Sequence, residues 1–353
     1  MFSSTNKTSN IYFGRSASYV PGTVISAYTK PLPPWVTAAT QLVDPGFGTY
    51  ATLGDSVATN LDGTVITAGA SNYNYSQGAV VVWRYSSGSW GSPVTLPDPG
   101  FGFYVNLGQT VAINSNGTVV TAGAPYYNSE TGAVVVWTYS GGTWGLPVTL
   151  PDPGFGDGRL GSGVAINSDG TVVTAGAYTL NRYTGVVVVW TYSGGSWGSP
   201  VTLLDPGLGQ FTYLGSPVAI NSNGTVVTAG ASGYNSDQGA IVMWTYSGGT
   251  WGSPVTLPDP GLGGGSGLGN GVAINSNGTV VTAGALYYNS YSYQGAVVVW
   301  RYSGGTWGTP VILPDPGLGT GTFLGNSVAI NSDGTVVTAG AFSADTVVVW
   351  TYS

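Results

Sequence analysis

The acidic side chains are the residues best placed to do chemistry here, because the chain has no histidine and no cysteine. Six of the 14 acids stand in a recurring Asp-Pro-Gly, namely Asp44, Asp98, Asp152, Asp205, Asp259 and Asp315. Three more stand in Asp-Gly turns, namely Asp62, Asp169 and Asp333. The others, Asp55, Glu130, Asp157, Asp237 and Asp345, recur in no paired constellation. Turn formation accounts for most of these carboxylates. Without the commonest general base and the thiol nucleophile, the sequence predicts no enzyme, no catalytic residue, no metal site and no cofactor.

Tyrosine and asparagine gather in the segments that vary most between copies of an internal repeat. One variable segment reads SNYNYSQ, PYYNSET, YTLNRYT, SGYNSDQ, LYYNSYSYQ and FSAD in successive copies, and the other follows each Asp-Pro-Gly. These residue types suit adaptable contact surfaces, although relaxed loop drift would give the same variation. The predicted binding-rim residues are Tyr73, Tyr75, Tyr126, Tyr127, Arg182, Tyr183, Tyr234, Tyr287 and Tyr288.

Tryptophans recur in pairs within VVVW[TR]YSGG[ST]W, and they allow two interpretations. The pairs are Trp83 with Trp90, Trp137 with Trp144, Trp190 with Trp197, Trp244 with Trp251, and Trp300 with Trp307. Packing between and along strands is the structural interpretation. Stacking against sugars of a multivalent ligand is the functional one.

The repeat that carries these residues recurs six times with a period of about 54 residues, which predicts stacked or radially arranged units. In the second copy, alternating or β-rich segments at 111–114, 118–124, 133–140 and 144–150 predict four strands, joined by Asn-Gly and Gly-Gly turns. A proline follows the second tryptophan of each pair by three residues, so the fourth strand should be a sheet edge.

These features predict an all-β fold, a six-bladed β-propeller of four-stranded blades. A linear β-solenoid is the alternative, but it usually has shorter rungs. Two tryptophans lack a partner: Trp350 ends a third strand and Trp35 belongs to a fourth strand. We therefore expect residues 31–43 to clasp the last blade of a propeller spanning 31–353, and residues 1–30 to form an arm.

The segment LG-x-x-VAIN-S-[ND]-G-TVVTAGA resembles the FG-GAP repeat of integrin-α-type propellers over residues 44–353. Leu107-Gly108 stands for the Phe-Gly of that family, and residues 122–125 stand for its Gly-Ala-Pro end. The family often carries calcium loops rich in carboxylates. Here the corresponding turn offers at most one carboxylate, whereas calcium needs about six to eight oxygen ligands, so the resemblance implies no metal.

Charge and composition restrict the partners. Only 6% of residues are charged, the net charge is −7, and no basic patch favours nucleic acid. No apolar run is long enough for a transmembrane helix, and the N-terminus lacks the apolar region of a signal peptide. The arm holds three of the seven basic residues, and its candidate assembly contacts are Lys7, Tyr12, Phe13 and Arg15.

Together these observations predict a non-catalytic structural or recognition component of a large assembly, a virion or appendage surface protein, with the arm bound to other protein subunits. The partner of the rim would be a surface glycan or a host receptor, and the location would be a virion or an extracellular surface. A secreted multivalent glycan-binding lectin is the alternative.

Overall fold

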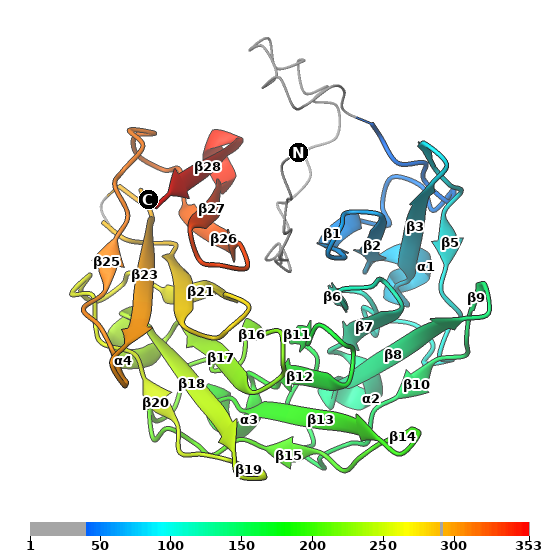
Figure 1. Cartoon of the computed structure of the whole chain (residues 1–353), viewed down its shortest axis with the longest axis horizontal. Coiled ribbons are helices and arrows are strands. Elements are labelled where there is room, and N and C mark those ends of the chain that lie inside the picture. Colours follow the sequence, from blue (N-terminus) through cyan, green and yellow to red (C-terminus); the bar gives the residue numbers. More distant parts are fainter. Residues whose placement is uncertain (1–39, 290–291, 353) are drawn as a thin grey trace, which may run out of the picture.

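The computed structural model describes residues 40–289 and 292–352. Six antiparallel sheets follow one another around a central axis, each built from one copy of the repeat (Figure 1). This arrangement confirms the predicted all-β, six-bladed propeller. None of the described helices is long and apolar enough to cross a membrane.

Each blade starts at the axis and runs outward. The innermost strands are β1 (Leu53–Thr59), β6 (Thr110–Ile113), β11 (Gly163–Ile166), β16 (Val218–Ile220), β21 (Leu268–Ile274) and β26 (Leu324–Ile330). The second strands are β2 (Val65–Ala70), β7 (Val119–Ala124), β12 (Val172–Gly176), β17 (Val226–Ala231), β22 (Val280–Ala285) and β27 (Val336–Ala341). The third strands are β3 (Val80–Ser86), β8 (Ala133–Ser140), β13 (Val187–Ser193), β18 (Ala240–Ser247), β23 (Ala296–Ser303) and β28 (Thr346–Thr351).

The fourth strand of the first five blades is split into two short pieces, both paired with the third strand. These pieces are β4 (Ser89–Trp90) and β5 (Val94–Thr95), β9 (Thr143–Trp144) and β10 (Val148–Thr149), β14 (Ser196–Trp197) and β15 (Val201–Thr202), β19 (Thr250–Trp251) and β20 (Val255–Thr256), and β24 (Thr306–Trp307) and β25 (Val311–Ile312). The break falls at Gly-x-Pro, because proline cannot donate to the ladder. The proline therefore marks the outer edge, as predicted, and also interrupts it.

The hairpin between the first two strands is held by a buried asparagine. In the second blade Asn114 is fully buried, and its Oδ1 accepts hydrogen bonds from the backbone N of Thr118 and of Val119, both at 2.9 Å. The backbone N of Ser115 then donates to the carbonyl of Ser168 in the next blade at 3.0 Å. These bonds explain why the INS[ND]G turn is nearly uniform along the chain. We call the face that carries these turns, at 60–64, 114–118, 167–171, 221–225, 275–279 and 331–335, the uniform rim.

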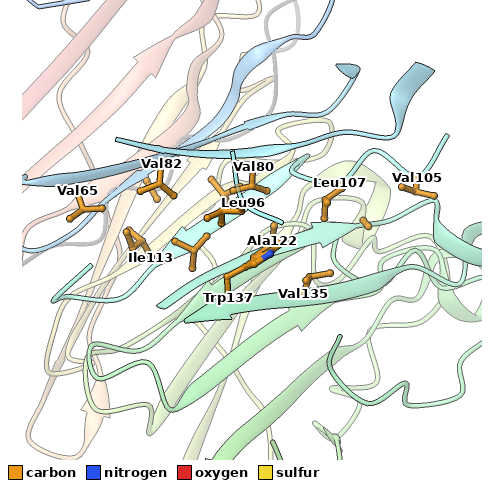
Figure 2. Packing of buried hydrophobic residues seen from close by; sticks show 14 residues of the cluster. Val65, Val80, Val82, Leu96, Val105, Leu107, Ile113, Ala122, Val135 and Trp137 are labelled. Atoms are coloured by element: carbon orange, nitrogen blue, oxygen red, sulfur yellow. The ribbon is translucent and has the colours of Figure 1, made fainter. Parts of the chain in front are cut away.

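The hydrophobic core lies between neighbouring blades. Val80 and Val82 of β3 point toward the second blade and pack with Ile113 and Trp137 there (Figure 2). The intervening Val81 belongs to the cluster on the opposite face of the first blade. Alternate residues of the third strands in the first five blades thus serve two successive cores, which is why these strands read as continuous apolar runs.

Glycine pairs let the blades approach closely. A Cβ added at Gly69 would lie 1.8 Å from the carbonyl oxygen of Gly108 in the next blade. The same contact recurs at Gly123 with Gly161, Gly176 with Gly215, Gly230 with Gly269, and Gly284 with Gly325. These positions exclude any side chain, so the glycines of LG and TAGA are required for the joints between blades.

The first tryptophan of each pair fastens a blade to the connection that leads into it. Trp137 is 1% exposed, and its Nε1 donates to the carbonyl of Pro97 at 2.8 Å. The equivalent donors are Trp83, Trp190, Trp244, Trp300 and Trp350. The second tryptophan is half-buried, and Trp90, for example, packs edge-on against Tyr85 at 5.4 Å between ring centroids.

The ring of described residues is open between the last blade and the first (Figure 1). The last sheet has three strands within the described part of the chain, β26, β27 and β28. Most of the clasp predicted at 31–43, including Trp35, and the whole arm at 1–30 lie outside the described residues. The fourth strand of the last blade therefore stays a prediction.

Candidate functional site

The two variable segments of the repeat meet on one rim. The backbone N of Tyr104, in the connection to the second blade, donates to the carbonyl of Tyr75 in the first blade at 3.1 Å. Asn106 N donates to Ser76 O at 2.8 Å. Equivalent bonds join the next four pairs of blades. We call this face the variable rim. It comprises the loops at 71–78, 125–132, 178–185, 232–239, 286–289, 292–295 and 342–345 and the connections at 45–52, 99–106, 153–159, 206–213, 260–267 and 316–323.

The rim loops hold consecutive residues in the left-handed region. The short elements α1 (Tyr73–Ser76), α2 (Tyr127–Glu130), α3 (Leu180–Tyr183) and α4 (Tyr234–Asp237) are therefore tight turns and not regular helix. In α1, Asn74 has φ 48° and Tyr75 has φ 57°. This conformation costs a non-glycine residue about 1–2 kcal/mol, and it persists only where the surroundings fix the backbone. The side chains of these turns are thus presented on a rigid scaffold.

Four of the nine predicted rim residues pack beneath the loops. The ring of Tyr73 lies 4.1 Å from that of Phe47, and the ring of Tyr127 lies 4.1 Å from that of Phe101. Tyr234 and Tyr288 are half-buried against the cores of the fourth and fifth blades. These tyrosines anchor the loops, so we leave them out of the proposed contact surface.

The other five predicted residues lie at the surface of the variable rim. Tyr75 is 72% exposed, while Tyr183 and Tyr287 are each 40% exposed. Arg182 is exposed and Tyr126 is half-buried. The structure adds exposed aromatic residues that sequence reasoning did not single out: Tyr50, Phe103, Tyr104, Phe211, Tyr293 and Phe342. Their signal was present in the sequence, since most of them stand in the variable connections.

Tyr75 and Phe103 pair at 5.6 Å between ring centroids, and several of the other rim aromatics form two larger clusters. In the first, the ring centroid of Tyr183 lies 6.1 Å from that of Phe211 and 5.4 Å from that of Tyr213. In the second, Phe323 lies 5.6 Å from Tyr293 and 6.2 Å from Tyr287. The rim therefore offers grouped apolar faces, with hydroxyl groups on the tyrosines.

One ion pair lies near the first cluster. The guanidinium of Arg159 bonds Glu130 at 2.8 Å, donates to the hydroxyl of Tyr178 at 3.0 Å and lies 4.7 Å over the ring of Tyr126. Burial acts to lower the pKa of Arg159, but the hydrogen bonds to Tyr178 and Glu130 outweigh it and raise that pKa. Arg159 therefore carries a fixed charge that already has its counter-charge.

A cavity of about 440 Å³ lies at the axis of the propeller. The innermost strands supply most of its wall through the residues that follow each Leu-Gly, among them Gln109, Thr110, Ser162, Ser216, Asn270 and Asn326. Tyr178, Tyr213 and Tyr287 of the variable rim line it as well. The cavity was not predicted from the sequence. Its only sequence signal is that small polar residues recur at these positions while the rest of the strand stays apolar.

The aspartates that recur in the repeat serve turns. Asp98 accepts from the backbone N of Gly100 at 2.8 Å, and the other Asp-Pro-Gly aspartates make the same bond. Asp62 accepts from the hydroxyl of Thr64 at 2.6 Å and from the backbone N of Thr64 at 3.0 Å, and these bonds lower the pKa of Asp62. In the described part of the chain, no three His, Cys, Asp or Glu side chains gather as a metal site would require.

The buried tryptophans bear on the sugar-stacking interpretation. Trp83, Trp137, Trp190, Trp244 and Trp300 are at most 3% exposed, so their rings lie in cores and not on a surface. The packing interpretation holds for them. A sugar that stacks on this protein would have to use other aromatic rings, such as those of the variable rim.

No protein-family model and no curated protein sequence matches the chain. Solved structures do match. Hydrazine synthase of Kuenenia stuttgartiensis is similar over 84% of this chain and 82% of its own, with 15% identity and a TM-score of 0.53. U3-55K is similar over 87% of this chain and 79% of its own, with 14% identity and a TM-score of 0.54. A putative TolB from Agrobacterium tumefaciens is similar over 84% of this chain and 88% of its own, with 15% identity and a TM-score of 0.44. At such identities the likeness concerns the fold alone.

Proposed function

We propose that this protein is a non-catalytic recognition component of a large assembly, a virion or an appendage surface protein. The observation that carries the proposal is the contrast between the two rims. Exposed aromatic side chains such as Tyr75, Tyr104 and Phe211 gather on the variable rim, while the turns of the uniform rim are nearly alike. A grouped, exposed aromatic surface is typical of interaction sites.

Rigid presentation supports binding by this rim. Tyrosine contributes a large contact area at a small loss of side-chain entropy, and a fixed backbone lowers the ordering cost of association. The left-handed turn at Tyr75 and the interblade backbone hydrogen bond from Tyr104 to Tyr75 fix the backbone at these positions in advance. We therefore assign recognition of a surface glycan or a host receptor to the variable rim.

Attachment to the assembly is assigned to the N-terminal arm, residues 1–30. Lys7, Tyr12, Phe13 and Arg15 are its proposed contacts with other protein subunits, and they lie outside the described residues. The support is compositional: the arm departs from the repeat and holds three of the chain's seven basic residues, whereas the net charge is −7. The proposed location is the surface of a virion or an extracellular appendage, without nucleic acid or membrane insertion.

The repeats are proposed to be of FG-GAP type without the calcium loop. The support is the Leu-Gly and Gly-Ala glycines at the joints between blades, together with turns that hold their own backbone through Asn114 and its equivalents. The oxygen atoms of these turns are used by backbone N–H groups and threonine hydroxyls, which leaves few for a cation.

A secreted multivalent glycan-binding lectin is the second candidate. The tyrosine clusters around Tyr183 and Tyr287 favour it, because aromatic faces flanked by hydroxyl and amide groups suit sugars. In that case the protein would act free of any particle.

Sedimentation of native source material, followed with an antibody against the recombinant propeller, separates the two candidates. The proposal expects the protein to sediment with particles far larger than the chain, and immunogold to label their surface. Sedimentation only as the free chain would contradict the assembly role.

Competition for attachment tests the rim. Excess recombinant propeller should reduce attachment of the particles to their target cells, and a Tyr75→Ser, Tyr104→Ser, Phe211→Ser variant should not. The matched control is Tyr85→Ser with Tyr302→Ser, because these tyrosines are 43% and 44% exposed but stand away from the variable rim, in the outer hairpins. If the rim variant reduced attachment as strongly as the control variant, recognition by the rim would be refuted.

A further inference from the structure

The wall of the axial cavity mixes apolar and polar side chains, and the described residues that form it carry no charge. Its polar side chains include the amides of Gln109, Asn270 and Asn326 and several serine hydroxyls, and no Asp, Glu, Lys or Arg stands among the described residues that line it. The nearby charge of Arg159 is already paired with Glu130. A charged ligand would lose its water here without gaining a counter-charge, so the cavity favours a neutral ligand.

One polar group in this wall lacks a partner. The side-chain Oε1 of Gln109 is buried and has no hydrogen-bond partner among the described residues. A buried carbonyl left without a hydrogen bond is unfavourable, so a donor that reached it would stabilise the site. Gln109 lines the cavity through its other atoms, so Oε1 would meet a ligand donor only after the side chain rotates toward the cavity.

Aromatic rings complete the wall on the rim side. Tyr178 and Tyr213 lie 6.4 Å apart between ring centroids, and Tyr287 lines the cavity from the fifth blade. A ligand held here would meet apolar ring faces as well as amide and hydroxyl groups. Pyranose sugars have this combination, since hydroxyl groups surround a patch of C–H bonds.

We propose that the axial cavity binds an uncharged, polyhydroxylated ligand, the terminal hexopyranose of a neutral glycan. The volume of about 440 Å³ lies within the range of about 300–1,000 Å³ usual for small-molecule sites. This inference rests on the proposal that the variable rim is the recognition face, and it names the chemistry that the centre of that face accepts.

Saturation-transfer NMR on the purified full-length chain tests the inference. The probes are the methyl glycosides of galactose, glucose and mannose, with sialic acid as the charged comparison. We expect at least one neutral glycoside to bind with a dissociation constant on the order of 1 mM, as for a small ligand with few contacts, and sialic acid not to bind.

Variants locate the binding. Gln109→Met and Asn270→Leu together should weaken the glycoside affinity at least tenfold, because the neutral wall loses two amides. Tyr85→Ser, in an outer hairpin and outside both the variable rim and the cavity wall, should leave the affinity unchanged. Thermal melting establishes that each variant is folded. If the double variant does not fold, ring-labelled tyrosine in the unmodified chain replaces it, and signals of Tyr178, Tyr213 and Tyr287 should shift on titration.

The outcomes distinguish this inference from the proposed function. If no neutral glycoside binds, or if the double variant binds as before, the cavity assignment is overturned, while recognition by the outer rim still stands or falls by the competition assay. If glycoside binds in the cavity but the protein never sediments with particles, the sugar site holds and the assembly role fails.

Discussion

Closure of the ring can be tested on two valines of β28. Val347 and Val349 are 65% and 57% exposed, whereas their equivalents in the fifth blade, Val297 and Val299, are 1% and 2% exposed. In the fifth blade these valines pack against the next blade. The next blade around the ring from the sixth is the first. We predict that these two blades meet in solution, as the other five neighbouring pairs do.

The first and the sixth blade each carry the residues that form the contact between the other neighbouring blades. Gly54 of the first blade has open space where its equivalents meet a neighbour, and Gly340 of the sixth meets only the Oγ of Ser327. Leu42 packs near Trp83, and the carbonyl of Val43 accepts from Trp83 Nε1 at 2.9 Å, as Pro97 does for the second blade. The chain thus enters the first blade as if it came from a preceding outer strand.

The expected loss in the free energy of unfolding follows from the burial of the two valines in the closed ring. Removing a mostly exposed valine from water contributes about 1 kcal/mol, and a polar substitution adds the cost of a buried hydroxyl. Val347→Ser with Val349→Ser should therefore lower the free energy of unfolding by about 2–4 kcal/mol in urea titrations. The control, Val94→Ser with Val148→Ser, changes valines that are 48% and 49% exposed on outer strands, and should cost below about 1 kcal/mol. Equal losses in both variants would refute closure.

Truncation separates the clasp from the arm. Deleting residues 1–43 should cost several kcal/mol, because the last blade would lose its predicted fourth strand and Trp83 would lose its acceptor. Deleting residues 1–22 should leave the melting temperature of the isolated protein nearly unchanged. An unchanged melting temperature after the longer deletion would contradict a clasp formed by residues 31–43.

Three further predictions concern the body of the propeller. Trp244→Phe should lower the free energy of unfolding by about 1–3 kcal/mol because the carbonyl of Leu204 loses its donor, and Trp251→Phe, at the half-buried outer position, should cost less. Millimolar calcium should leave the melting temperature unchanged, and a clear rise would reveal a cation site. The lowered pKa values of Asp62 and Asp333 contribute stability above the unfolded pKa, which is lost as pH falls through the lower folded value. The variant with both Asp62→Asn and Asp333→Asn should therefore have the melting temperature of the parent at pH 7 but lose less stability than the parent below about pH 4. A loss of stability in acid equal to that of the parent would contradict this.

Much of the fold could be predicted because the repeat specifies it locally. The Asn-Gly turns, the alternation of β-rich strands and the edge proline each act within about ten residues, so one copy contains the information for one blade. The split of the fourth strand could have been read from Gly145 and Pro147, which interrupt the ladder. The glycine joints could be predicted only as small residues, since their partners lie about 40 residues away in the next blade.

The binding face could be predicted only in part, because position in a loop does not determine which way a side chain points. Tyr126 and Tyr127 are neighbours in sequence, yet the first lies beside Arg159 at the surface and the second packs on Phe101. Left-handed turns reverse the direction of the chain within three residues, so strand alternation gives no guide there. The aromatic rings left for recognition are those that the interblade cores do not use. In four of the loops the Phe or Leu of the preceding Asp-Pro-Gly connection packs with one tyrosine ring, as Phe101 does with Tyr127, and the other rings of the loop remain free.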